Sequence, residues 1–155
     1  MIHPKQPFSD GLGGAWAQTK PSCGNGEVDS PYIITTAEEL KWFRDEVNHG
    51  RKNICAKIAD NVEVIDMSTV CHAADKSQNL EEVSWEPIGN TTNNYMGTFD
   101  GNNKTITNLY INANQEYSGF FGYTFISTIK NLPQFGIKKR GWKFGSLQYF
   151  SYLCR

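Results

Sequence analysis

Long apolar runs, metal-binding motifs and redox motifs are all missing from this sequence of 155 residues. A membrane-spanning helix needs about 20 consecutive apolar residues, and the longest strictly apolar stretches here are only a few residues long. None of the three histidines belongs to an HExxH motif, which excludes a zincin-type peptidase site. We therefore expect no membrane span and no metal site in this chain.

Cysteine pairs with CxxC spacing are also absent, which disfavours a zinc or thioredoxin-like site. The four cysteines are Cys23, Cys55, Cys71 and Cys154. A bridge between Cys55 and Cys71 in an exported chain and four free, mostly buried thiols are both compatible with the sequence, because four cysteines allow three connectivities. The first 14 residues lack the apolar segment of a signal peptide, so we expect no such peptide in this chain.

Acidic residues are absent after Glu116. The whole chain has a formal net charge of −1, but residues 130–155 hold six basic residues and no acidic one. A basic segment of this kind attracts anions. Because no nucleic-acid reader motif accompanies it, we expect no nucleic-acid partner.

One helix is predicted, over residues 37–48. Thr36 is a good N-cap residue, and Glu39 follows three positions later, which completes a capping box. Three apolar residues recur with helical spacing and fall on one face, namely Leu40, Phe43 and Val47. Short strands are predicted within residues 54–70, where apolar and polar residues alternate around a turn at Asp60-Asn61.

Two stretches within residues 83–132 resemble each other at an offset of 22 to 23 residues. A unit of this length falls in the range of solenoid repeats, and it is too short for a helix–turn–helix repeat. In a parallel β-helix each turn stacks on the turn before it, so equivalent residues align. The equivalent pairs are Phe99 and Phe121, Ile106 and Ile129, Asn108 and Asn131, and Leu109 and Leu132. The two asparagines are expected to form an amide ladder, and the isoleucine and leucine pairs are expected to stack.

The repeated stretches resemble the GLUG repeats of large, exported, adhesin-like bacterial surface proteins. The residues that carry the resemblance are Trp85–Asn90, Met96–Ile111, Tyr117–Tyr123 and Thr128–Leu132. Such repeats also flank the catalytic region of some immunoglobulin A peptidases. Because the family is similar to β-helical passenger domains, the resemblance implies a mainly β fold, a right-handed parallel β-helix of a few rungs. It also implies an extracellular or cell-surface location.

Three regions are expected along the chain. Residues 1–31 form a loop-rich lead, residues 32–132 form the β-helix capped by the helix, and residues 133–155 form a basic, aromatic tail in which the repeat register is lost. The tail is either a cap that shields the last open rung or the product of a truncation or frameshift. An uncapped rung favours self-association through the open end of the β-helix.

Three groups of residues carry chemistry that an enzyme or a lectin could use. Asp60, Glu63, Asp66 and Asp100 are carboxylates that either serve a carbohydrate-active site or are solvated turn residues. Cys71 and His72 are adjacent, and adjacent strand residues point to opposite faces, so no catalytic dyad is expected. The aromatic residues that either stack on sugar rings or pack in the core are Trp16, Trp42, Trp85, Tyr95, Tyr110 and Tyr123.

The sequence thus predicts a non-catalytic β-helical scaffold or adhesion module of an exported bacterial surface protein. A carbohydrate-binding or carbohydrate-active β-helix protein is the alternative, and a truncated product without independent function is a third interpretation. We expect no catalytic residue and no cofactor. The expected partner is a host or cell-surface protein or a glycan.

Overall fold

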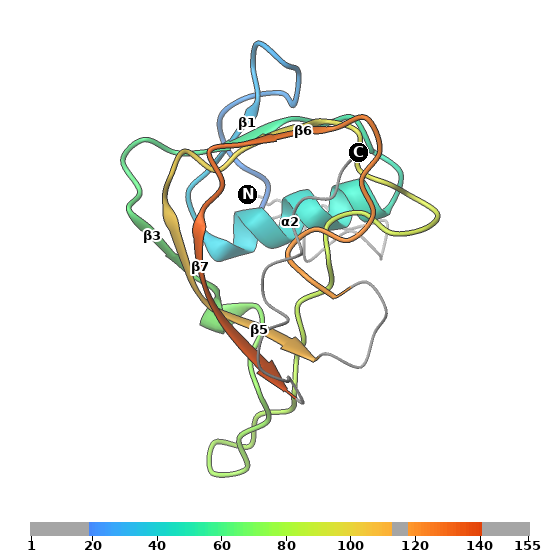
Figure 1. The fold of residues 1–155 in the computed structure, drawn as a ribbon. Coiled ribbons are helices and arrows are strands. Elements are labelled where there is room, and N and C mark those ends of the chain that lie inside the picture. Colours follow the sequence, from blue (N-terminus) through green and yellow to red (C-terminus); the bar gives the residue numbers. More distant parts are fainter. Residues whose placement is uncertain (1–18, 113–117, 141–155) are drawn as a thin grey trace, which may run out of the picture.

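The computed structural model describes residues 19–112 and 118–140, which form a mainly β structure with one helix (Figure 1). The strands make two parallel sheets. The first sheet contains, in this order, β1 (Tyr32–Ile34), β2 (Ala56–Ile58), β4 (Thr98–Asp100) and β6 (Thr128–Lys130). The second sheet contains β3 (Val64–Asp66), β5 (Thr105–Asn112) and β7 (Gln134–Arg140). The expectation of a mainly β chain with one helix is confirmed.

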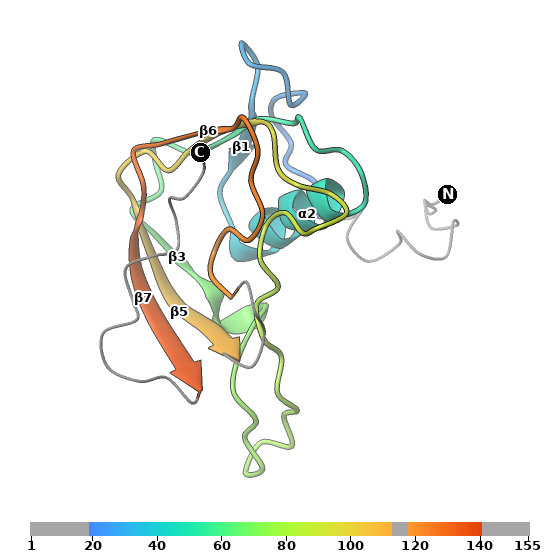
Figure 2. The same ribbon diagram turned by 45° about the vertical axis from the view of Figure 1, so that its right-hand side comes forward.

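From β2 onward, successive strands alternate between the two sheets, so the chain passes through them in three tiers. We call β2 with β3 the first tier, β4 with β5 and the segment that precedes β4 the second tier, and β6 with β7 and the segment that precedes β6 the third tier. Isolated parallel bridges from Ile88 to Phe121 and from Tyr95 to Thr124 join the segments that precede β4 and β6. In Figure 2, β7, β5, β3 and helix α2 follow one another across the view, so the helix lies beyond the first tier.

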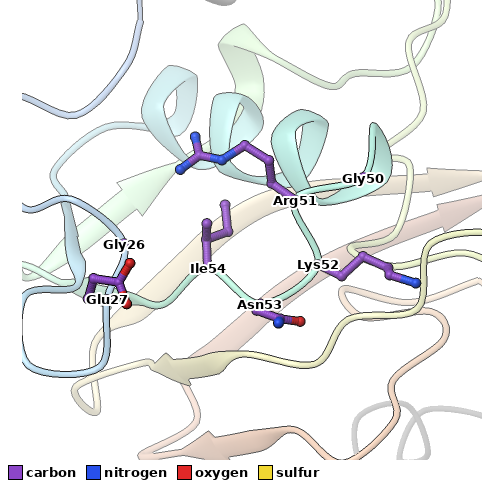
Figure 3. A pocket seen from close by; sticks show the side chains of 7 residues that line it. All are labelled: Gly26, Glu27, Gly50, Arg51, Lys52, Asn53 and Ile54. Carbon is purple, nitrogen blue, oxygen red and sulfur yellow. The ribbon is translucent and has the colours of Figure 1, made fainter.

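Helix α2 (Ala37–Asn48) has the bounds that the sequence predicts. The Thr36 hydroxyl accepts a hydrogen bond of 3.1 Å from the backbone N–H of Glu39. The Glu39 carboxylate accepts bonds from the backbone N–H and the hydroxyl of Thr35, one residue earlier than in a standard capping box. The helix is followed by Gly50, whose φ of 115° suits glycine (Figure 3).

Replacing Thr36 by alanine is expected to lower the free energy of unfolding by about 1 kcal/mol, because the Glu39 N–H loses its capping acceptor. Urea titration followed by far-UV circular dichroism measures this loss. Thr91→Ala, at an exposed position, is the matched control and is expected to stay within about 0.5 kcal/mol of the parent chain. Equal losses in the two variants would contradict the capping role.

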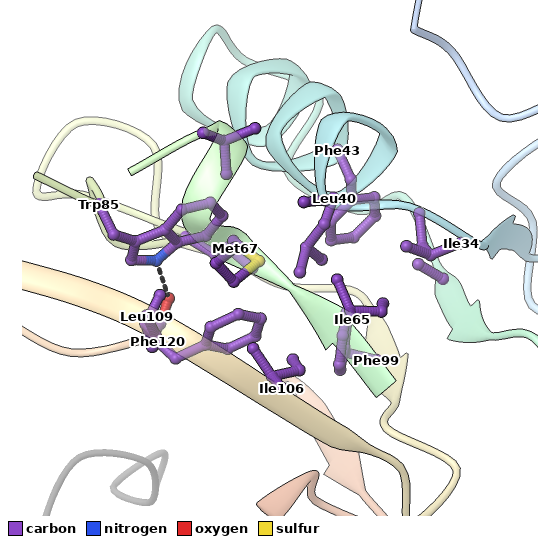
Figure 4. Packing of buried hydrophobic residues seen from close by; sticks show 14 of the residues in the cluster. Ile34, Leu40, Phe43, Ile65, Met67, Trp85, Phe99, Ile106, Leu109 and Phe120 are labelled. Atoms are coloured by element: carbon purple, nitrogen blue, oxygen red, sulfur yellow. Dashed lines mark hydrogen bonds between the residues drawn. The ribbon is translucent and has the colours of Figure 1, made fainter. Parts of the chain in front are cut away.

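The core lies between the helix and the three tiers (Figure 4). The predicted helix face, Leu40, Phe43 and Val47, is fully buried in it. Phe99 on β4 is at its centre, since its ring lies 5.9 Å from that of Phe43 and 5.3 Å from that of Phe121. Aromatic rings from the helix, the second tier and the third tier are therefore packed into one cluster.

A buried asparagine at the end of α2 joins the helix to the segment before β4. The Asn48 amide nitrogen donates to the carbonyl of Pro87 at 2.9 Å, and its amide oxygen accepts from the backbone N–H of Gly89 at 2.8 Å. Gly89 in turn accepts a hydrogen bond from the backbone N–H of Tyr123 in the third tier. One polar chain thus crosses from the helix to the last tier.

The expected register of the repeats is wrong. β4 pairs with β6, so Phe99 is opposite Ile129 and not Phe121. β5 pairs with β7, so Ile106 is opposite Phe135 and Leu109 is opposite Ile137. Leu132, the expected partner of Leu109, is 40% exposed. The offset between paired residues of the last two tiers is therefore 29 or 30 residues near the start of each strand, as in Thr98 with Thr128, rather than 22 or 23.

The sequence repeat instead marks a shared local conformation. Asn108 lies within β5, at the register shift between Ile106 and Leu109, and Asn131 follows β6; their φ values are 56° and 48°. Asparagine tolerates this left-handed region better than most residues do. The same letters, Thr-Ile-x-Asn-Leu, therefore recur where an asparagine takes a left-handed φ, even though the two segments lie in different sheets.

Parallel pairing continues beyond Leu132, where the sequence analysis expected the register to end. β7 runs from Gln134 to Arg140 along β5. The Phe135 ring lies 4.9 Å from that of Phe120, so the first tail aromatic extends the core. The other aromatic residues of the predicted tail, Trp142 to Tyr152, lie outside the described residues.

Candidate functional site

The four carboxylates singled out from the sequence lie along the strands and turns that link the two sheets. We use the name polar corner for Asp60, Glu63, Asp66 and Asp100 together with four side chains of the following tiers that bind them, which are Asn102, Lys104, Asn108 and Asn131. Each of these acidic residues belongs to one tier, and the donors named with it belong to the next. The polar corner therefore connects tiers rather than lining an open groove.

Three asparagine–aspartate pairs are the repeating unit of the polar corner. The amide nitrogen of Asn102 donates to Asp60 at 2.8 Å, that of Asn108 to Asp66 at 2.9 Å, and that of Asn131 to Asp100 at 2.9 Å. The asparagine ladder expected from the sequence is therefore wrong, because each amide meets a carboxylate of the preceding tier. A carboxylate accepts without competing donors, so it is a stronger partner for an amide N–H than another amide.

Lysines complete the polar corner. Lys104 Nζ lies 3.1 Å from Glu63 Oε1 and also donates to the backbone carbonyl of Asp60 at 3.0 Å. Lys57 Nζ lies 2.9 Å from Asp60 Oδ1. These lysines pair with Asp60 and Glu63, two of the four carboxylates considered for a carbohydrate-active site.

The Asp60 carboxyl group has a pKa below its ordinary value. The main cause is its hydrogen bond with Lys57, followed by the bond from Asn102. A general acid at neutral pH requires the opposite shift. Asp60 is therefore suited to holding tiers together and unsuited to donating a proton.

This shift predicts how stability depends on pH. Because the pKa of Asp60 is lower in the folded chain, its contribution to stability is present above its ordinary pKa and is lost as the pH falls through the folded value. The difference in urea midpoint between neutral and acidic pH is therefore expected to shrink in Asp60→Asn. The control Glu81→Gln, at an exposed position, is expected to keep the parent difference, and a full parent difference in Asp60→Asn would contradict the prediction.

Cys71 and His72 do not form a nucleophilic pair. The Cys71 thiol is packed against the backbone, within 3.6 Å of the Met67 carbonyl and 3.3 Å of the Tyr110 N–H. Burial raises the pKa of this thiol, which disfavours the reactive thiolate. The His72 ring contacts the Ala73 carbonyl instead. Cys23, Cys55 and Cys71 are free thiols, and Cys154 lies outside the described residues.

Most of the aromatic side chains considered for sugar stacking are in the core. Trp42, Trp85, Tyr95 and Tyr110 are all at most 5% exposed. Trp85 stacks on Phe120 at 5.5 Å, and its indole N–H donates to the Phe120 carbonyl, as Figure 4 shows. Tyr123 is 37% exposed, and Trp16 lies outside the described residues.

A pocket of about 420 Å³ opens beside the connection from α2 to β2 (Figure 3). It is lined by Gly26, Glu27 and residues 50–54. The Arg51 guanidinium points away from this connection in Figure 3 and binds Glu46 and the Tyr32 hydroxyl. The guanidinium of Arg51 is therefore held by Glu46 and Tyr32.

The remaining predicted residues are structural. Thr36 and Glu39 cap α2, and Ile106 and Leu109 are fully buried on β5. Phe121 is buried, and Ile129 is partly buried against the core.

Sequence reasoning missed Asn48, Asn102 and Lys104. The Asp-Gly-Asn-Asn turn at 100–103 was a signal for Asn102, but no pattern marked the other two.

Within residues 19–112 and 118–140, no three His, Cys, Asp or Glu side chains are grouped so that they could hold a metal ion. The described part of the chain also contains no helix with the length and apolar character needed to cross a membrane.

No protein-family model matches this chain, and no solved structure matches it. It is similar to a protein of Evansella cellulosilytica described as a putative Gly-rich membrane protein, with 30% identity over 100 residues. The aligned region is 64% of this chain and 10% of that protein, so the chain spans about a tenth of its relative's length. The similarity therefore concerns one segment of a much longer protein.

Proposed function

We propose that the chain is a section of a right-handed parallel β-helix that acts as a non-catalytic scaffold or adhesion module of an exported bacterial surface protein. The alternation of successive strands between two parallel sheets is evidence for a β-helix. The bridges at Ile88 and Tyr95 would form its third face. The right hand follows from the strong preference of parallel crossover connections for that hand.

The observation that carries the non-catalytic proposal is that the carboxylates of the polar corner bind side chains of the neighbouring tier. Asp60, Glu63, Asp66 and Asp100 are each held by a donor from the following tier. Groups engaged in this way stabilise a stack of tiers, which is what a scaffold requires. The carbohydrate-active alternative has less support, because it needs free carboxylates and exposed aromatic rings.

The surface location has two supports. The GLUG resemblance is to exported proteins, and the Evansella relative is described as a membrane protein about ten times as long as the segment it shares with this chain. A short stack within a long surface protein would present an extended face to a host or cell-surface protein or glycan.

Display on a bacterial cell through a foreign anchor tests this function. Cells that carry the chain are expected to be retained under flow on mucin-coated or collagen-coated glass several-fold better than cells that carry Phe99→Asp, which removes the folded core. The same preparation is expected to release no reducing sugar from soluble polysaccharides. Equal retention of the two cell types, or release of sugar, would overturn the proposal.

A further inference from the structure

Two aromatic side chains of the third tier lie at the surface instead of in the core. Tyr95 is fully buried and is opposite Thr124 in an isolated parallel bridge. Successive residues of an extended segment point to opposite faces, so the residues on either side of Thr124 point outward. These are Tyr123, which is 37% exposed, and Phe125, which is 48% exposed. We call Tyr123 and Phe125 together the outer platform.

A polar loop of the second tier, residues 90–94, borders the outer platform. Both ends of the loop are bonded to Tyr123, whose N–H donates to the Gly89 carbonyl at 3.0 Å and whose carbonyl accepts from the Tyr95 N–H at 2.9 Å. The loop has the sequence Asn-Thr-Thr-Asn-Asn, and Thr91 and Thr92 are exposed. Its side chains are therefore amides and hydroxyls, which both donate and accept hydrogen bonds.

Hydrogen bonds within the chain hold this loop in place. The side-chain oxygen of Asn90 accepts from the backbone N–H groups of Thr92 at 3.1 Å and Asn93 at 2.8 Å. The Asn93 amide nitrogen donates to the Asn48 carbonyl at 2.7 Å, which fastens the loop to the end of α2. A loop that is already ordered loses less conformational entropy when it binds a ligand.

Charged side chains are missing from both segments. Residues 88–97 and 118–129 contain no Asp, Glu, Lys, Arg or His. A charged ligand that binds here would lose hydration without gaining an opposite charge from either segment. The composition therefore favours an uncharged ligand.

The residue after the outer platform is strained. Ile126 is 75% exposed and has a φ of 53°, a conformation that costs a β-branched residue free energy. Strain of this kind is concentrated at ligand-binding sites. Its position directly beside Phe125 is a second reason to assign binding to this surface.

We propose that the outer platform and loop 90–94 bind a neutral glycan. The C–H faces of sugar rings would pack on Tyr123 and Phe125, and the sugar hydroxyls would pair with the amides and hydroxyls of the loop. A protein partner fits less well, because protein-binding surfaces are enriched in arginine as well as aromatic residues and bury about 800 Å² on each side. Binding, unlike cleavage, requires no free carboxylate. The inference rests on the proposed adhesion role and adds the class of ligand.

Isothermal titration calorimetry with the full chain tests this inference. The neutral probes are cellohexaose, mannohexaose and chitohexaose. Each has a charged counterpart of the same length, oxidised to uronic acids or, for chitohexaose, de-N-acetylated. At least one neutral probe is expected to bind, and its charged counterpart is expected to bind at least about tenfold more weakly. Absence of binding by all neutral probes, or equal binding of the charged counterpart, would overturn the inference.

Removal of the two rings identifies the surface. The variant Y123A/F125A is expected to lose at least about tenfold in affinity for the neutral probe that binds best. The matched control L80A/V83A removes side chains of similar exposure, 41% and 42%, from the hairpin between β3 and β4, and is expected to lose less than about twofold. Equal losses in the two double variants would overturn the inference.

A conservative variant separates stacking from folding. Phe125→Trp keeps an aromatic ring and is expected to stay within about threefold of the parent affinity. Far-UV circular dichroism is recorded for every variant to show that the chain is folded. A tenfold loss in folded Phe125→Trp would contradict stacking on this ring.

Three further outcomes identify other occupants of the outer platform. Sugar binding that appears only after residues 141–155 are removed would assign the outer platform to this chain's own C-terminal segment. A dimer that dissociates in Y123A/F125A would assign it to a second copy. Retention of displayed cells on deglycosylated mucin, lost in Y123A/F125A, would assign it to a protein. Each result would overturn the glycan proposal.

The two proposals fail separately. Retention of displayed cells that persists in Y123A/F125A would overturn this inference and leave the adhesion role intact. Sugar binding by the chain without retention of cells would overturn the adhesion role and leave the glycan site intact.

Discussion

Phe99→Ala is expected to lower the free energy of unfolding by about 3–5 kcal/mol, the range for removing a buried phenylalanine. The Phe99 ring has no exposed surface and lies within 6 Å of the rings of Phe43, Phe120 and Phe121. A cavity at this position would separate the helix, the second tier and the third tier at once. Urea unfolding followed by tryptophan fluorescence measures the loss.

A loss of this size is a large part of the 5–15 kcal/mol by which most domains are stable. Phe99→Leu, which keeps much of the side-chain volume, is therefore the second variant and is expected to lose less than Phe99→Ala. Phe125→Ala is the surface control and is expected to change stability by no more than about 0.5 kcal/mol, because its ring is 48% exposed. Similar losses at Phe99 and Phe125 would contradict the packing described here.

Gly89→Ala is expected to cost at least about 3 kcal/mol for two separate reasons. The φ of Gly89 is 87°, where a side chain is strained by about 1–3 kcal/mol. An added Cβ would also lie 2.2 Å from the carbonyl oxygen of Tyr123 and 3.0 Å from the backbone nitrogen of Tyr95. The second and third tiers would have to move apart to admit it.

Gly50→Ala separates the cost of backbone strain from the cost of steric overlap. Gly50 has a φ of 115°, but no heavy atom lies within 4 Å of an added Cβ. It is expected to pay the backbone strain alone, about 1–2 kcal/mol. The difference between the two variants, measured by urea titration, reports how closely the tiers approach at Gly89. No difference would show that the tiers are not in contact there.

The helix was predictable because its signals are local. The capping residues Thr36 and Glu39 and the apolar spacing of Leu40, Phe43 and Val47 lie within a dozen residues of one another. Local geometry decides such an element, and the tertiary fold only adds the surface that buries its apolar face. The turn at Asp60-Asn61 and the strands on either side of it were predictable for the same reason.

The register of the tiers was not predictable in this way. Thr105–Leu109 and Thr128–Leu132 match in sequence, yet they lie in different sheets. Their shared asparagine reports a left-handed backbone position, which occurs here both within a strand, at the register shift of β5, and after the end of β6. Which strands then pair depends on the lengths of the intervening loops and on the packing of Phe99, Phe120 and Phe121, which no single segment encodes.

The polar corner was predictable only as a set of residue types. The carboxylates Asp60, Glu63, Asp66 and Asp100 stood out in the sequence, but their donors Asn102, Lys104 and Asn108 are about 40 residues away along the chain. The sequence therefore revealed the acidic residues but not the side chains that donate hydrogen bonds to them. The pairing converts a candidate acidic site into a connection between tiers.

Nuclear Overhauser effects across the second and third tiers test the central claim, which is the parallel stacking of the tiers in this register. Cross-peaks are expected between the side chains of Phe99 and Ile129 and between those of Ile106 and Phe135, because these residues are opposite each other in the sheets. The same spectrum is expected to contain no cross-peak between Ile106 and Ile129. Cross-peaks between Ile106 and Ile129, with none between Phe99 and Ile129, would show that the tiers follow the sequence repeat and would contradict this account.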